Sequence, residues 1–181
     1  MHYGDFSCMI ICMDKQQNWK FKKFDDLSLN DLYDILQLRS RIFVVEQNAI
    51  YLDADGLDKA AHHLLFRTDH GQLVAYCRLL PPGSLFTEAA IGRVVVDPDF
   101  RGLGLAREML RQAIPMCLAL YQVNKIHISA QRYLHDLYAS FGFQAVTADY
   151  LEDGILHVGM DYNSGTRYEI GSDEKSSRVT P

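Results

Sequence analysis

The sequence has no long hydrophobic run and no excess of basic residues. Hydrophobic residues make up 48% of its 181 positions, but they form no stretch long enough to span a membrane. The formal net charge is −5, whereas a general nucleic-acid-binding protein normally shows clustered basic residues. We therefore expect neither a membrane nor a nucleic acid as partner, although a local basic site for a phosphorylated ligand is compatible with this composition.

Cysteine is also scarce. The sequence contains four cysteines: Cys8, Cys12, Cys77 and Cys117. They show neither CxxC spacing nor the density of a small disulfide-stabilised protein. Inert free thiols are typical of a reducing compartment, so we expect a cytoplasmic protein. The first 20 residues also lack the basic and long apolar segments of a secretory signal peptide, and both Met1 and Met13 are candidate start positions.

Three segments have the patterns of helices. Ser28, followed three residues later by Asp31, resembles a capping box and predicts the start of the first helix. Apolar residues then recur near helical spacing as far as position 43. A second helix is predicted over 104–121, interrupted near Pro115, and a third over 131–141.

Four segments have the apolar patterns of strands: 62–68, 72–80, 89–96 and 125–130. A hairpin is predicted over 143–162, because Asp153-Gly154 between alternating runs is a strong two-residue turn signal. The chain has too few strand–helix–strand repeats for a doubly wound nucleotide-binding fold. The patterns predict instead a single α/β (α+β) domain with a mixed sheet. We assign three parts: an N-terminal extension (1–19), the domain (20–162) and a polar C-terminal tail (163–181).

The stretch VVVDPDFRGLGLAREML (94–110) joins a strand to a helix through a glycine-containing turn. Asp97 precedes Pro98, which favours an extended conformation and the end of the strand. Gly102 and Gly104 allow the backbone to approach a ligand closely, and the first N–H groups of a helix lack partners within it. Such groups at the positive end of a helix dipole can bind a pyrophosphate. A plain glycine-rich turn accounts for the glycine spacing equally well.

Two familiar phosphate-binding motifs are absent from this turn. The Walker motif needs Gly-Lys-Ser/Thr, and no lysine follows these glycines, while the dinucleotide motif GxGxxG needs glycine at the position of Arg107. The pattern Arg-x-x-Gly-x-Ala is present instead, at Arg101, Gly104 and Ala106. It resembles the coenzyme A pyrophosphate loop of the GCN5-related N-acetyltransferases (the GNAT family), whose pattern is Gln/Arg-x-x-Gly-x-Gly/Ala.

The resemblance extends over residues 20–162. Tyr138 precedes the pair Gly142-Phe143 in the order and at the distance typical of the family. Three segments are similar to those of its small bacterial ElaA-like branch: FVVEQ (43–47), the DGLD loop (55–58) and YLEDGILHVGM (150–160). The resemblance implies a mixed central sheet that is flanked by helices and splayed between its middle strands, where pantetheine is held.

The resemblance also implies which residues bind acetyl-CoA. Backbone groups of Val94 and Val96 would pair with the acetyl carbonyl and the pantetheine amides, and the amides of the loop would hold the pyrophosphate. Arg107 or Arg132 would meet the adenosine phosphate end, although each is equally compatible with a solvated surface arginine. The coenzyme-binding residues expected from the resemblance are Val94, Val95, Val96, Arg101, Gly102, Leu103, Gly104, Leu105, Ala106 and Arg107.

The implied reaction is direct transfer of an acetyl group from acetyl-CoA to a primary amine within a ternary complex. Tyr138 would protonate the departing thiolate, since a phenol and a thiol differ only modestly in pKa. Packing of Tyr138 in the core is the alternative. Neither an acyl-enzyme nor a metal is expected, because no Gly-x-Ser-x-Gly elbow occurs and the adjacent His62 and His63 would point to opposite sides of a strand.

The acceptor amine must lose a proton, and Glu46 is our first choice of catalytic base because it lies in the branch-specific segment. An exposed or capping role for Glu46 is the alternative, and four other residues are further candidates: Asp55, Glu88, His63 and His157. The segment 39–58 is expected to shape the acceptor side. We expect the acceptor to contact Arg39, Gln47, Asp55, His63 and His157.

The identity of the acceptor stays open, since an amino acid, a polyamine, an amino sugar or a peptide amine would each fit. A homodimer is compatible with the sequence. A non-catalytic acyl-CoA sensor on the same fold is the alternative to an enzyme, and a nucleotide-binding protein of another fold would prefer ATP or NAD.

Overall fold

The computed structural model describes residues 18–165. Cys8, Cys12, both candidate start positions and most of the predicted extension and tail therefore lie outside the described residues. Within 18–165, one sheet of eight strands forms the centre of the molecule, in the order β1-β2-β3-β4-β5-β8-β6, with β7 paired to β8. The strands are β1 (Trp19–Lys23), β2 (His62–Arg67), β3 (Leu73–Leu80), β4 (Ala89–Val96), β5 (Lys125–Gln131), β6 (Gln144–Ala145), β7 (Tyr150–Glu152) and β8 (Ile155–Asn163).

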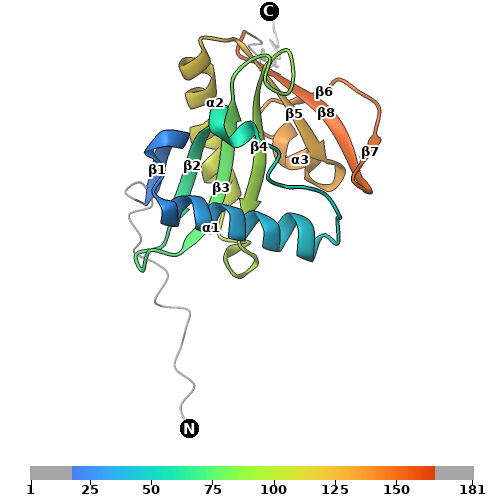
Figure 1. Ribbon diagram of the computed structural model, residues 1–181. Helices are drawn as coiled ribbons and strands as arrows, with labels where there is room; N and C mark the ends of the chain where they lie inside the picture. Colours follow the sequence, from blue (N-terminus) through green and yellow to red (C-terminus); the bar gives the residue numbers. More distant parts are fainter. Residues whose placement is uncertain (1–17, 166–181) are drawn as a thin grey trace, which may run out of the picture.

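The helices cover the two faces of this sheet (Figure 1). On one face α1 (Leu29–Arg39) packs its buried side chains against those of β2, β3 and β4, including Leu65, Tyr76 and Val95. On the other face α2 (Leu105–Tyr121) and α3 (His135–Ala139) pack in the larger core cluster. The remaining helical segments are short: η2 (Phe24–Asp26), η3 (Ser40–Glu46), η4 (Leu57–Ala60), η5 (Pro98–Phe100) and η6 (Arg132–Leu134).

The two middle strands separate soon after they meet. β4 and β5 are parallel, and their pairing is confined to Ala89 with Ile126 and Ala90 with His127. The other strand pairs are antiparallel. Beyond Ala90, the backbone groups of β4 that face β5 have no strand partner within the described residues. The expectation of a mixed sheet splayed between its middle strands and flanked by helices is therefore confirmed.

Several local predictions are also confirmed. Ser28 and Asp31 form a reciprocal capping box, in which the Asp31 amide donates to the Ser28 hydroxyl at 3.0 Å. The turn at Asp153-Gly154 joins β7 to β8, with both residues at positive φ. The predicted strands at 62–68, 72–80, 89–96 and 125–130 correspond to β2, β3, β4 and β5.

The predicted interruption of the second helix is wrong, and one strand was missed. α2 runs unbroken through Pro115, because its buried residues Ala113, Ile114 and Cys117 hold both halves on the sheet. The loss of one backbone hydrogen bond at a proline is thus outweighed by packing. The first and third helices are present where they were predicted, the first as α1 followed by the π-helix η3 and the third as η6 followed by α3. β1 was not predicted, although its Trp19 packs against Phe66.

Candidate active site

A cavity of about 450 Å³ opens where β4 and β5 separate. Its walls come from five parts of the chain: η3 with the following loop, β4, the start of α2, η6 with α3, and β5 with the β7–β8 hairpin. These parts are distant in sequence, and the divergence of the two strands brings them together. No helix within 18–165 has the length and apolar character needed to cross a bilayer.

The cavity gathers part of the residue set expected from the sequence. Nine of those residues line it: Gln47, Asp55, Val94, Val95, Val96, Arg101, Ala106, Tyr138 and His157. The other expected residues are not part of its lining: Arg39, Glu46, His63, Gly102, Leu103, Gly104, Leu105 and Arg107.

The loop before α2 presents a run of backbone amides with no backbone partner in the described structure. Arg101 N donates to Pro98 O at 3.2 Å, and helical bonding resumes where Glu108 N donates to Gly104 O at 3.0 Å. The amides between these two points are free for a ligand, as the first N–H groups of a helix are. Gly102 and Gly104 have φ of +77° and +80°, which explains the glycines at these positions. This arrangement fits a diphosphate.

Tyr138 belongs to both the core and the cavity. Its side chain is 5% exposed, and its ring packs edge-on against Phe143 with centroids 5.8 Å apart. Burial raises the pKa of its hydroxyl above that of a free phenol, so Tyr138 is protonated at neutral pH. Within residues 18–165, the Tyr138 hydroxyl oxygen is not one of the polar atoms that are fully buried without a hydrogen-bond partner. The residue also lines the cavity. A phenol so placed can donate its proton to a bound ligand.

Glu46, our first choice of catalytic base, lies outside the cavity and is engaged elsewhere. Its carboxylate accepts a hydrogen bond from Arg101 Nη2 at 2.7 Å, and both side chains are largely exposed. The ion pair links the end of η3 to the start of the loop before α2. A carboxylate that neutralises Arg101 in this way is poorly placed to accept a proton inside the cavity.

The two arginines considered for the adenosine phosphate end also have partners. Arg107 donates to the Ser140 hydroxyl at 3.0 Å, and Arg132 pairs with Asp149 at 3.1 Å. Both contacts are exposed. These arginines therefore tie α2 to the end of α3 and η6 to the segment before β7.

A closed ring of three arginines and three aspartates lies beside the cavity. Each aspartate pairs with two arginines and each arginine with two aspartates, in the cyclic order Arg39, Asp53, Arg93, Asp55, Arg78, Asp58. The charges sum to zero, and the ring joins the end of α1, the loop 53–58, β3 and β4. The substrate contact expected of Arg39 is not retained, because this side chain is 0% exposed and faces Asp53 and Asp58.

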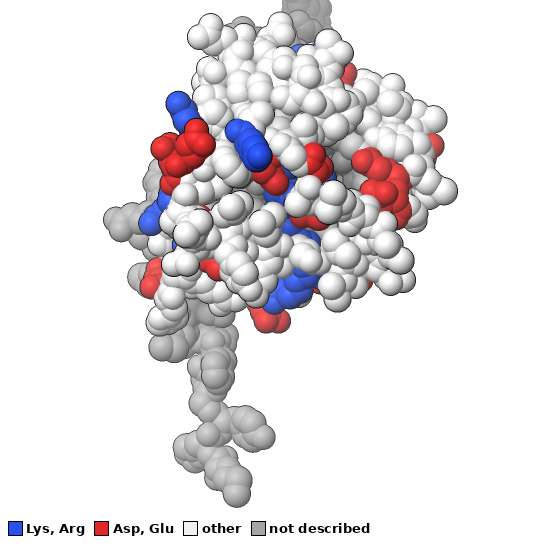
Figure 2. Space-filling view, viewed as in Figure 1, with Lys and Arg blue, Asp and Glu red and all other residues white. Residues whose placement is uncertain are grey.

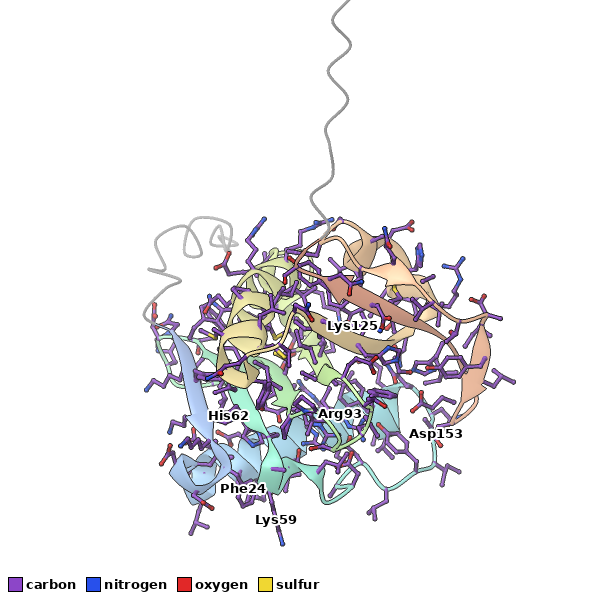
Figure 3. All side chains as sticks on the ribbon, turned by 90° about the horizontal axis from the view of Figure 1, so that it is seen from above. Phe24, Lys59, His62, Arg93, Lys125 and Asp153 are labelled. Carbon is purple, nitrogen blue, oxygen red and sulfur yellow. The ribbon has the colours of Figure 1, made fainter. Side chains whose placement is uncertain are left out.

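Arg93 belongs to both this ring and the lining of the cavity, and its role was not predicted from the sequence. It has a φ of +52°, which is uncommon for a residue other than glycine. It lies where the pairing of β3 with β4 is irregular. Its Nε donates to Asp53 Oδ1 at 2.7 Å, and Figure 3 shows it near the centre of the molecule. The only signal available was an arginine within an otherwise apolar strand.

His63 is buried away from the cavity, so its expected contact with the acceptor is not retained. Its Nε2 donates to the backbone oxygen of Asp58 at 3.1 Å, which leaves Nδ1 to accept from the Tyr76 hydroxyl at 2.8 Å. Burial lowers the pKa of the His63 ring, so the neutral form is favoured. With both nitrogens engaged, His63 is not a base for the reaction. Glu88 also lies outside the cavity, where it pairs with Lys125 at 2.9 Å.

His157 is the histidine that lines the cavity. Its Nδ1 lies 2.8 Å from the backbone oxygen of Ile155, and a carbonyl can only accept, so the proton of the neutral ring is on Nδ1. The Nε2 lone pair has no partner within the described residues, and Nε2 is not a fully buried atom. The side chain is 9% exposed. His157 therefore presents an accessible acceptor nitrogen in a largely buried setting.

A directed chain of hydrogen bonds lies on the same side of the cavity, and none of its members was singled out from the sequence. Ser129 Oγ donates to Glu152 Oε2 at 2.7 Å, because an ionised carboxylate only accepts. The Tyr150 hydroxyl, 2.6 Å from Ser129 Oγ, must then donate to it. Nearby, Gln47 and Gln131 form a hydrogen-bonded amide pair. Ser129, Gln131 and Glu152 all line the cavity.

The surface charges around this region are mixed. Figure 2 shows basic and acidic side chains interspersed on the face that carries α1, with no continuous patch of one sign. Within residues 18–165 no group of three or more His, Cys, Asp or Glu side chains is placed to hold a metal ion.

Comparison with known proteins supports the same interpretation. The family model of the acetyltransferase (GNAT) domain matches residues 43–164. A UPF0039 protein of Synechocystis is 43% identical over 143 residues, which cover 79% of this chain and 93% of that protein. Protein ElaA of Escherichia coli is 38% identical over 145 residues, covering 78% of this chain and 94% of ElaA.

A solved structure agrees with these sequence matches. An acyl-CoA N-acyltransferase from Pseudomonas aeruginosa aligns with a TM-score of 0.74 and 42% identity, covering 80% of this chain and 98% of that one. Its fold is thus shared almost throughout its length. The chain belongs to the GNAT acetyltransferase family, as a homologue of ElaA.

Proposed function

We propose that the protein is an acetyl-CoA-dependent N-acetyltransferase that acts on a primary amine of a small molecule or peptide. Family membership supports acyl transfer from an acyl-CoA, and one structural feature carries the finer proposal. The cavity at the β4–β5 divergence is lined by the start of α2, by Tyr138 and by His157. The proposed proton donor and proton acceptor thus share one space, and the loop proposed to hold the diphosphate adjoins it at Arg101 and Ala106.

Tyr138 and His157, the proposed acid and base, lie on different sides of the sheet. His157 is paired with Gln131 and shares its face. Tyr138 packs in the core cluster of α2 and α3 together with Ile128 and Ala130 of β5. Ser129 and Gln131 alternate with those residues, so they point to the opposite face, where Gln131 meets Gln47. An amine that enters from this face can attack a thioester held between the strands while the sulfur leaves toward Tyr138.

The reaction follows from these positions. A protonated amine gives a proton to Nε2 of His157, and its nitrogen then forms a bond to the thioester carbon. Backbone N–H groups of β4 left free by the divergence stabilise the oxyanion. The C–S bond breaks, and Tyr138 donates its proton to the thiolate. The new amide nitrogen loses its extra proton, Tyr138 regains one from solvent, and His157 releases to solvent the proton that it took from the amine. Each turnover therefore yields the N-acetyl product, coenzyme A and one proton.

Replacing Gly104 by valine should abolish measurable acetyl-CoA binding. A β-branched residue at a φ of +80° is strongly disfavoured, so the loop must change conformation and its amides no longer converge. Calorimetric titration with acetyl-CoA measures the effect, with ATP and NAD as competing ligands. Gly71→Val, at a similar φ of +84° in the β2–β3 turn, is the matched control and should bind normally. Equal binding by wild type and Gly104→Val would contradict the proposed loop function.

Replacing His157 by glutamine should lower turnover by about 10²-fold or more without weakening acetyl-CoA binding. Glutamine preserves a polar side chain of similar reach but cannot accept a proton. Release of the coenzyme A thiol, measured on a panel of primary amines, reports turnover. His62→Gln is the control, because His62 lies at the β1–β2 edge (Figure 3) and outside the cavity lining. Full activity of His157→Gln would remove His157 from the mechanism.

A non-catalytic acyl-CoA sensor on the same fold is the second candidate, and it predicts acetyl-CoA binding without turnover of any amine. The exposed ion pair of Glu46 with Arg101 beside the loop is the feature that a sensor could use. A cytoplasmic location is part of the proposal, since Cys77 and Cys117 are buried free thiols whose pKa values are raised by burial.

A further inference from the structure

The charges that line the cavity are not all balanced. Arg93 is paired with Asp53 and Asp55, and Arg101 is paired with Glu46. The cationic side chains of the lining are therefore already neutralised. Glu152, by contrast, has no basic partner within the described residues, and its contact is with the neutral hydroxyl of Ser129. Asp153, in the β7–β8 turn, is a second lining carboxylate without a basic partner within the described residues. The cavity thus presents two uncompensated carboxylates, of which Glu152 is the one held by another side chain.

The carboxylate of Glu152 is held in place by other side chains. Tyr150 donates to Ser129, and Ser129 donates to Oε2 of Glu152. Both hydroxyl protons of the chain point toward the carboxylate. Oε2 is occupied by Ser129, and Oε1 is left to accept from a ligand. The position of the negative charge is therefore set before an acceptor binds.

The hairpin pairing places this carboxylate and the proposed base on the same face of β7 and β8. His157 pairs with Tyr150, and Glu152 follows Tyr150 by two residues on β7. Residues so related lie on the same face, as diagonal neighbours about 7–8 Å apart. Figure 3 shows Asp153, the next residue, at the end of the hairpin. The His157 side chain is largely buried, and its Nε2 has no partner within the described residues. These two observations indicate a ligand site here.

We infer that the acceptor is an aliphatic diamine or a molecule with an equivalent pair of amino groups. One nitrogen loses its proton to His157 and attacks the thioester, while the second stays protonated and pairs with Glu152. A spacer of four or five carbons between the two nitrogens is of the same order as the spacing of diagonal neighbours on the hairpin, about 7–8 Å. Glu152 is thus a specificity-determining residue. This inference rests on the proposed N-acetyltransferase function.

The test compares 1,4-diaminobutane with butylamine, which has the same length but lacks the second charge. Thiol release gives kcat/KM for each amine with the wild type and with Glu152→Gln. A charge-assisted contact predicts that the wild type prefers the diamine by about tenfold or more. Glu152→Gln should lower this ratio to about one by raising the KM for the diamine, with little change for butylamine. Glu88→Gln, the same substitution outside the cavity lining, should keep the wild-type ratio.

The outcomes separate this inference from the function on which it rests. Equal kcat/KM for the two amines, or a preference that survives in Glu152→Gln, would overturn the diamine inference alone. Failure of both amines while another amine of a broad panel is acetylated would do the same. If no amine is acetylated although acetyl-CoA binds, the proposed enzymatic function and the inference are both overturned. Unchanged thermal unfolding of Glu152→Gln shows that the variant is folded.

Discussion

Replacing Tyr138 by phenylalanine is expected to lower turnover by about 10²–10⁴-fold while acetyl-CoA binding stays unchanged. The substitution removes only the hydroxyl, so the edge-on contact with Phe143 and the packing of α3 are retained. Without the hydroxyl the leaving thiolate loses the proton donor that the proposed mechanism assigns to it. Since burial keeps this phenol protonated at neutral pH, wild type carries the required proton throughout the physiological range. Thiol release and calorimetric titration measure the two quantities separately.

Tyr133→Phe is the matched control for this prediction. Tyr133 also lines the cavity, but its side chain is largely exposed and it has no place in the proposed mechanism. Equal losses in the two variants would mean that a phenolic hydroxyl is needed for general polarity in the cavity, not for proton transfer. Full activity of Tyr138→Phe would assign Tyr138 to packing alone. Absence of turnover in the wild type as well would favour the acyl-CoA sensor.

Local patterns in the sequence predicted the elements that local interactions determine. The capping box at Ser28 and the hairpin turn at Asp153-Gly154 each depend on residues within a few positions of one another. The loop before α2 was likewise readable, because its glycines and the following helix are contiguous. The resemblance to the family then placed Tyr138 beside a cavity that no local pattern would have predicted.

The acceptor side could not be predicted because its residues are assigned by long-range contacts. Arg39 and His63 are residue types that commonly bind substrates. In the structure both side chains are buried, and both contact Asp58. Glu152 and Ser129 are ordinary polar residues of a hairpin and a strand, and they meet only because β8 pairs with both β7 and β5. A charged residue in a sequence does not reveal whether its partner is a ligand or another part of the chain.

The ring of arginines and aspartates supplies the second large expected effect. Replacing Asp58 by asparagine should lower the free energy of unfolding by about 3–5 kcal/mol, the usual cost of removing one partner from a buried ion pair. Asp58 pairs with Arg39 at 2.7 Å and with Arg78 at 2.9 Å, and both arginine side chains are almost completely buried. The variant leaves three arginines facing two aspartates. Urea denaturation measures the difference from wild type.

Asp149→Asn provides the comparison, because Asp149 pairs with Arg132 at the surface and such a pair contributes at most about 1 kcal/mol. A loss for Asp58→Asn no larger than for Asp149→Asn would mean that the ring does not stabilise the fold. Activity should fall together with stability, since the same ring holds Arg93 and Asp55, which line the cavity.

The pH dependence of this difference tests the electrostatic origin of the effect. Burial alone would raise the pKa of Asp58, but Arg39 and Arg78 hold it below its usual range, and Arg78 similarly lowers the pKa of Asp55 to about 2. A carboxylate with a depressed pKa stabilises the fold above its unfolded pKa and loses this contribution as the pH falls toward the folded value. The gap between wild type and Asp58→Asn should therefore be constant above about pH 5 and narrow below about pH 4. A gap that persists unchanged in acid would show that Asp58 acts by shape and hydrogen bonding and not by its charge.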